Sequence, residues 1–157
     1  MRKNIELTNQ DILAAHKALT LLEGRVEEWL TVDKPKKLIS YEFDKDGKCR
    51  YAISKNLETF GKEATGLQKL TEQNFKQCAN GDQELTPGSA AHEAFRKLQD
   101  TLFDTKEEVR VWFIDWAWLN VEKNRIPTGV LAALSPVLTG APEGEEPDEP
   151  VTEKTES

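Results

Sequence analysis

Three of the four tryptophans in this chain lie within seven positions, in the stretch VRVWFIDWAWLN that begins at Val109. Trp112, Trp116 and Trp118 are an even number of residues apart, so a continuous strand would place them on one face. Arg110 would share that face. Aromatic rings stack on planar ligands and a nearby arginine can bind phosphate, but the same residue types also dominate cores and interfaces. Three interpretations stay open: a core strand, a protein interface or oligomer seam, and a small-ligand or nucleotide site.

The chain carries no recognisable catalytic motif. Asp115 is the most notable carboxylate because it interrupts the apolar run, and a strand end or a helix cap is a simpler explanation than an active site. Neither Gly-x-Ser-x-Gly nor a glycine-rich phosphate loop occurs. Two histidines (His16 and His92) and two cysteines (Cys49 and Cys78) are the other candidates, and their spacing is not that of a metal site. We predict a protein that is not an enzyme, with no metal and no cofactor.

The net charge of −7 belongs mainly to one end of the 157-residue chain. From Ala141 the sequence reads APEGEEPDEPVTEKTES, with seven acidic residues against Lys154 alone, so this part carries −6 and the rest only −1. Such a segment cannot bury enough apolar surface to order itself. We predict a single domain over residues 1–138 and a disordered acidic tail over residues 139–157, which acts as a solubilising segment or, alternatively, as a docking peptide or a nucleic-acid mimic. The nearly neutral domain disfavours nucleic acid as a partner.

Composition also bears on location. No apolar run approaches the ~18 residues that a membrane span requires. No apolar segment follows the basic N-terminus, and the two cysteines are far apart. Free thiols fit a reducing compartment. The sequence therefore predicts a cytoplasmic protein with no membrane partner.

Apolar periodicity predicts three main helices. The first follows Thr8, an N-cap paired with Asp11, and ends near Gly24. A long amphipathic helix runs from Ile53 to about Ala79. The third follows the turn at Thr86-Pro87, and the short linker before it favours antiparallel packing on the second. Its buried stripe is expected to be Ala91, Phe95, Leu98 and Leu102.

Three further segments complete the predicted fold. Residues 37–43 alternate partly between apolar and polar, and the turn DKDG after them suggests a hairpin whose second strand is residues 48–53. The alternative is that the long helix begins as early as Arg50. Residues 107–119 are rich in β-branched and aromatic side chains and are predicted to form a strand. Apolar residues on both of its faces mean that the strand is covered on both sides or that the pattern changes at Asp115. A short helix is expected near Pro127, with Pro136 ending it or starting another turn. The fold class is α+β and predominantly helical: two long antiparallel helices, a shorter N-terminal helix and a small β element.

The order of these segments resembles a group of small uncharacterised proteins encoded by tailed bacteriophages and prophages. The shared features are an LTN helix start, a YAI-KN entry to the long helix and a closing IP--VL-AL-P segment. In this chain they are Leu7, Thr8, Asn9, Tyr51, Ala52, Ile53, Lys55, Asn56, Ile126, Pro127, Val130, Leu131, Leu134 and Pro136. The resemblance spans roughly residues 6–139 and excludes residues 29–48, the later tryptophans and the tail. It implies a phage context, with the host cytoplasm as location, and implies no activity.

Together these observations predict an accessory protein of phage type that acts by binding another protein, from the phage or the host, as a structural adaptor or an inhibitor. We also expect it to form a homo-oligomer. The alternative is a protein that binds or sequesters a small ligand or nucleotide through Arg110 and the tryptophans.

Overall fold

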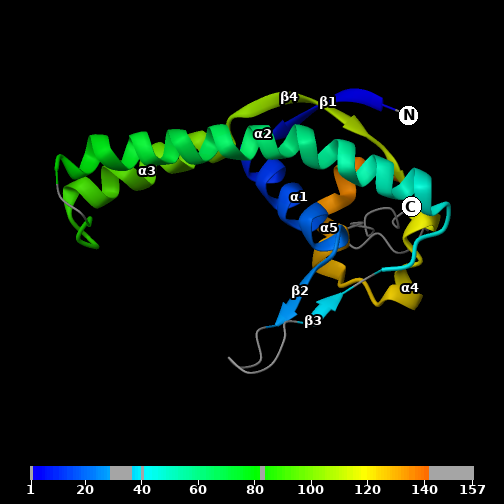
Figure 1. Cartoon of the computed structure of the whole chain (residues 1–157). Helices are drawn as coiled ribbons and strands as arrows, with labels where there is room; N and C mark the ends of the chain where they lie inside the picture. The colour runs from blue at the N-terminus through cyan, green and yellow to red at the C-terminus, as the bar shows by residue number, and fades with distance from the viewer. Residues whose placement is uncertain (1, 29–36, 40, 82–83, 142–157) are drawn as a thin grey trace, which may run out of the picture.

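The computed structural model describes residues 2–28, 37–39, 41–81 and 84–141. It has a predominantly helical α+β fold in which one long helix, α2 (Asp46–Ala79), runs the length of the molecule (Figure 1). The predicted fold class is confirmed. A globular part surrounds the first half of α2, and a helical arm formed by the second half of α2 and by α3 (Ala90–Asp104) extends from it.

The N-terminus forms a strand that the sequence analysis did not predict. β1 (Arg2–Thr8) pairs antiparallel with β4 (Lys106–Trp112) and leads directly into α1 (Asn9–Leu22). The predicted cap is confirmed, because the Thr8 hydroxyl accepts a hydrogen bond from the Asp11 backbone N–H at 3.1 Å. The strand anchors the start of the described chain, and its signal in the sequence was the alternation of apolar Ile5 and Leu7 with polar neighbours.

The predicted hairpin over residues 37–53 is wrong. β3 (Lys37–Ile39) pairs instead with β2 (Arg25–Glu28), which lies before it in the chain. Helix α2 begins at Asp46, earlier than either alternative allowed. Residues Cys49, Ala52 and Ile53 are buried at helical spacing against the core, so packing favoured helix over a returning strand.

Helix α3 packs antiparallel along the second half of α2, as predicted. The pairing is fixed by Phe75 against Phe95, with ring centroids 5.9 Å apart, and by Asn74 Nδ2, which donates to Gln99 Oε1 at 2.8 Å. The predicted stripe (Ala91, Phe95, Leu98 and Leu102) is only half-buried, and no residue of α3 is fully buried. We call residues 62–79 of α2 together with α3 the arm. Within the described residues the end of α3 contacts α1, and the rest of the arm consists of two helices with no third layer.

The predicted strand over residues 107–119 is confirmed as far as Trp112, and of the two alternatives the change of pattern at Asp115 is the correct one. β4 ends at Trp112, a short β5 (Ile114–Asp115) follows, and Trp116–Leu119 form the 3-10 helix η1. The change occurs where the pairing partner ends, since Trp112 lies opposite Arg2 at the start of β1. The Asp115 carboxylate then accepts the Ala117 N–H at 3.0 Å and caps η1.

The C-terminal part closes the globular half of the molecule. It contains α4 (Val121–Asn124), α5 (Thr128–Leu134), the 3-10 helix η2 (Ser135–Val137) and β6 (Leu138–Thr139). Pro127 is the N-cap of α5 and Pro136 lies in η2, as the sequence indicated. β6 pairs in parallel with β5, so Thr139 is still part of the paired chain, and residues 142–157 lie outside the described residues.

One hydrophobic core holds α1, the first half of α2, β4 and α5 together. Along α2 this core extends from Cys49 to Phe60, whereas Leu67 and Ala79 are buried outside it, in the arm. The helix α1 crosses beneath α2 (Figure 1). The His16 ring lies next to Gly61. Along α2, the core therefore supports only the first half of the helix, which lies beside β4.

Candidate binding surface

The end of the β1–β4 ribbon carries the exposed Arg110 and the half-buried Trp112 on its outer face. Val109 and Val111 are buried on the inner face, and alternation along β4 places Arg110 and Trp112 on the opposite side. Residues directly opposite in an antiparallel pair share a face, so Arg2 joins Trp112 there, as Asn4 joins Arg110. Two of the five candidates from the sequence thus share one exposed face.

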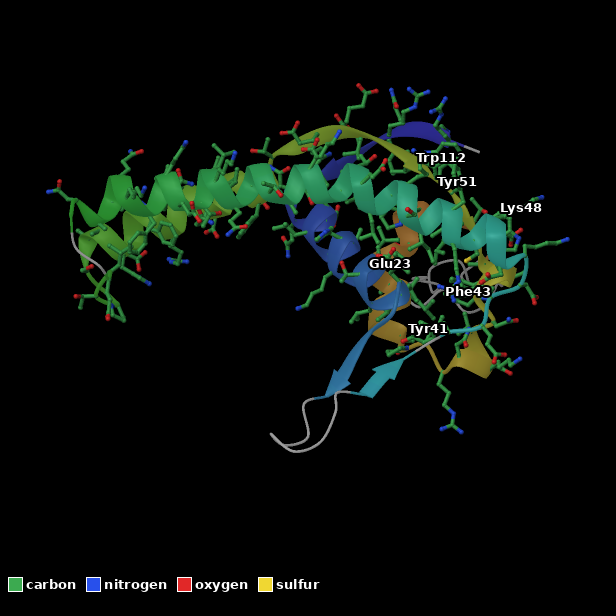
Figure 2. The ribbon with its side chains drawn as sticks, in the orientation of Figure 1. Glu23, Tyr41, Phe43, Lys48, Tyr51 and Trp112 are labelled. Carbon is green, nitrogen blue, oxygen red and sulfur yellow. The ribbon has the colours of Figure 1, made fainter. Side chains whose placement is uncertain are left out.

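Aromatic and cationic side chains from three elements gather at this point. The Arg2 guanidinium carbon lies 5.1 Å from the centre of the Trp112 ring. Tyr51 of α2 meets that ring edge-on, with centroids 5.2 Å apart and an interplanar angle of 89° (Figure 2). Lys55 Nζ lies 5.8 Å from the centre of the Tyr51 ring. Tyr51 is nevertheless 52% exposed, so a large aromatic area faces solvent.

We call this group the cation–aromatic surface; its members are Arg2, Tyr51, Lys55, Arg110 and Trp112. Arginine on a tryptophan face contributes ~0.5–1 kcal/mol at an exposed site, and an edge-to-face aromatic pair adds a similar amount. These contacts restrict the side-chain rotamers before any partner arrives. The surface is therefore partly preorganised.

Behind the surface, one buried amide joins α2 to β4. Asn56 is 0% exposed; its Nδ2 donates to the Trp112 carbonyl at 2.8 Å, and its Oδ1 accepts the Trp112 N–H at 2.8 Å. The amide thereby occupies the place that a third strand would have beside β4. It positions the backbone of Trp112 directly next to the helix that carries Tyr51 and Lys55.

The charge of the ribbon changes sign along its length. Arg2 and Arg110 lie at the Trp112 end, whereas Glu6 and Glu108 are opposite one another two positions further on. Lys55 is paired with Glu58 at 3.4 Å, but both side chains are exposed, so this pair is weak. The cation–aromatic surface is therefore a short basic region, which ends where the two glutamates begin.

The structure separates the other three sequence candidates from this surface. Trp116 and Trp118 are half-buried in η1, and Trp118 packs against the core. Its carbonyl accepts the Asp44 N–H at 2.8 Å, which ties η1 to the segment before α2. Asp115 has the capping role that the sequence analysis favoured. The even spacing of the tryptophans did not place them on one face, because β4 ends at Trp112 and residues 116–119 form a 3-10 helix.

The remaining candidate residues for chemistry are the two cysteines and the two histidines. Burial raises the pKa of the Cys49 thiol to about 12, so it is no nucleophile at neutral pH. His16 and His92 lie on different helices. Within residues 2–28, 37–39, 41–81 and 84–141, no three histidine, cysteine or acidic side chains are grouped so that they could hold a metal ion. None of the helices in those ranges is long and apolar enough to cross a membrane.

Sequence reasoning missed several residues that organise this region. Arg2, Tyr51 and Lys55 were not proposed for the surface, because they are remote from Trp112 in the sequence. Asn56 gave a readable signal: it is a polar residue on the apolar stripe between Ile53 and Phe60. A polar residue at a buried helical position requires a hydrogen-bond partner, which here is the strand.

Comparison with known proteins does not assign this chain to a family. No protein-family model, no curated protein and no solved structure matches this chain.

Proposed function

We propose that this protein is a non-enzymatic binding protein that recognises an acidic segment of a partner protein through the cation–aromatic surface. One observation carries the proposal: Tyr51, Trp112 and Arg2 meet on an exposed face, with Tyr51 half open to solvent. Tryptophan, tyrosine and arginine are the residues that most often supply the binding energy of protein interfaces.

The chemistry of the surface defines the partner. Arginine side chains bind carboxylates with two parallel hydrogen bonds, and the rings offer apolar contact beside them. Arg110 and Arg2 lie on adjacent strands, diagonal to one another, so both can reach carboxylates of one short segment.

The same charges argue against a nucleic-acid strand as the partner. Glu6 and Glu108 begin two positions beyond Arg110 and Asn4, and a phosphate backbone that continued along the ribbon would meet them. A short acidic peptide can end before that point. The resemblance to phage proteins supports a phage or host protein as the source of this peptide, with the chain acting as an adaptor or an inhibitor.

Fluorescence anisotropy with a labelled twelve-residue peptide of glutamate and leucine tests this proposal. Because the tail is itself acidic, the peptide is titrated into the full chain and into a full-length variant with a neutral tail. The substitutions of that variant are Glu143→Gln, Glu145→Gln, Glu146→Gln, Asp148→Asn, Glu149→Gln, Glu153→Gln and Glu156→Gln. We expect saturable binding that weakens as salt is raised. Arg2→Glu/Arg110→Glu should weaken it by about tenfold or more.

The matched control is Lys62→Glu/Lys69→Glu, which makes the same change in net charge at exposed positions of the arm. It should leave peptide affinity within about twofold, because those lysines lie outside the surface. A lysine-leucine peptide should not bind. Lack of binding by both tail forms, equal loss in the control, or tighter binding of a twelve-nucleotide oligothymidine would each overturn the proposal.

A further inference from the structure

We infer that residues 142–157 of this chain occupy the cation–aromatic surface when no partner is bound, and so compete with the partner. The inference rests on the proposed function, because it assigns to the tail the chemistry proposed for the partner. The occupant of the surface is then a segment of the same molecule.

Residues 142–157 and the cation–aromatic surface carry opposite charges. Residues 142–157 carry seven carboxylates and one lysine, whereas Arg2, Lys55 and Arg110 make the surface basic within a protein of net charge −7. The acidic residues in the tail are interrupted by prolines, which favour an extended chain that presents its side chains outward. Val151 is the one aliphatic side chain among them, and the exposed Tyr51 ring offers it apolar contact.

The described part of the chain ends close to the cation–aromatic surface. Thr139 pairs with Asp115, which follows Trp112 by three residues. Gly140 turns the chain with a φ of 75°, and a Cβ at this glycine would lie 3.3 Å from Asp115 Oδ1. At ~3.3–3.6 Å per residue, the path along the chain from Ala141 through this pair to Trp112 is at most about 25 Å. Residues 142–157 extend to ~50 Å, so they reach the surface easily.

Tethering makes such a contact effective even when it is weak. A short flexible connection gives a local concentration in the millimolar range, which exceeds the concentration of most partners. Occupation by the tail would also cover the exposed aromatic area of Tyr51 and Trp112. A partner with a stronger acidic segment would displace the tail.

Paramagnetic relaxation enhancement measured by NMR tests the inference on the full-length chain. A nitroxide is attached to Thr152→Cys in a Cys78→Ser background, where the buried Cys49 stays unlabelled. We expect broadening of the amide signals of residues 2–4 and 110–112 and of the Trp112 indole N–H, and none in residues 66–79 of the arm. The neutral-tail variant should abolish the broadening, as should 0.5 M salt. In the peptide titration, the neutral-tail variant should bind about tenfold more tightly than the wild-type chain.

Three results would overturn the inference. The first is broadening that is absent or spread evenly over the molecule. The second is broadening that persists in the neutral-tail variant. The third is broadening that appears when spin-labelled chains are mixed with isotope-labelled chains lacking the nitroxide, since this would place the tail on a second copy. The two proposals can fail separately: peptide binding by the neutral-tail variant without localised broadening keeps the proposed function and removes only the role of the tail.

Discussion

Asparagine side chains connect segments of this protein that are far apart in the sequence. Asn56 joins α2 to the backbone of Trp112. Asn124 accepts the Glu42 N–H at 3.0 Å and donates to the Glu42 carbonyl at 2.9 Å, so it fixes the chain before α2 against α4. Asn9, buried at the start of α1, donates to the Leu102 carbonyl near the end of α3 at 2.8 Å. Each amide satisfies backbone groups that no neighbouring strand or helix turn reaches.

The substitution Asn56→Ala should destabilise the protein by about 3 kcal/mol, because it leaves the N–H and the C=O of Trp112 without partners beside a buried helix. Urea denaturation followed by circular dichroism measures the free energy of unfolding. Asn74→Ala is the control, since its amide is only half-buried in the arm and should cost below about 1 kcal/mol. Equal losses in the two variants would show that water replaces the Asn56 amide.

At the scale of elements, α2 has two halves with different support. The core covers it from Cys49 to Phe60, and beyond that point it depends on α3 and on its own helix propensity. Gly66 lies in this second half, and a Cβ built on it meets nothing within 4 Å. Gly88, before α3, also has open space around it, but its φ of 86° is one that residues with a side chain rarely adopt.

Two glycine-to-alanine substitutions should therefore have opposite effects. Gly66→Ala should stabilise the protein by about 0.5–1 kcal/mol, because alanine loses less backbone entropy in a helix. Gly88→Ala should destabilise it by about 1 kcal/mol through strain at positive φ. Thermal unfolding should show Tm shifts of roughly 2–4 °C in the two directions. A shift of the same sign in both would contradict the assignment of Gly66 to a helix and Gly88 to a turn.

The whole molecule combines a cored globular part with a two-helix arm. In the arm, Phe75 packs on Phe95 and a polar seam links Thr71 and Asn74 to Gln99. Leu70 stays 44% exposed, and no residue of α3 is fully buried. Beyond the contact between α1 and the end of α3, the described residues of the arm form two helices without a third layer, which bury little apolar surface. The arm therefore adds length to the molecule with little stability of its own.

Hydrogen exchange should show this difference directly. We expect the backbone amides of residues 68–79 and 90–98 to exchange by local opening at least about tenfold faster than those of α1 and of residues 49–60. Mass spectrometry of exchanged peptides at micromolar protein concentration measures both regions in one sample. Uniform protection that falls on dilution would instead show that a second copy covers the arm. Self-association remains a prediction, and light scattering after size exclusion tests it.

Local chemistry along the chain was enough to predict most of the helical fold. The cap at Thr8, the apolar periodicity of the three main helices and the start of a short helix at Pro127 all depend on neighbours within a few residues, and each was confirmed. The separation of an acidic end from a nearly neutral domain follows from counting charges alone. Such features depend on neighbours three or four positions away, which the sequence displays directly.

Only the tertiary structure decided where strands end and which side chains meet. Lys37–Ile39 pairs with an earlier segment, β4 stops opposite Arg2, and Asp115 caps a turn that removes two tryptophans from the predicted face. The cation–aromatic surface brings together residues 2, 51, 55, 110 and 112, and the contacts between them span up to 110 positions. Strand pairing and helix packing determine such contacts through long-range burial, and the local pattern at Trp112 is the same whether or not Tyr51 lies beside it.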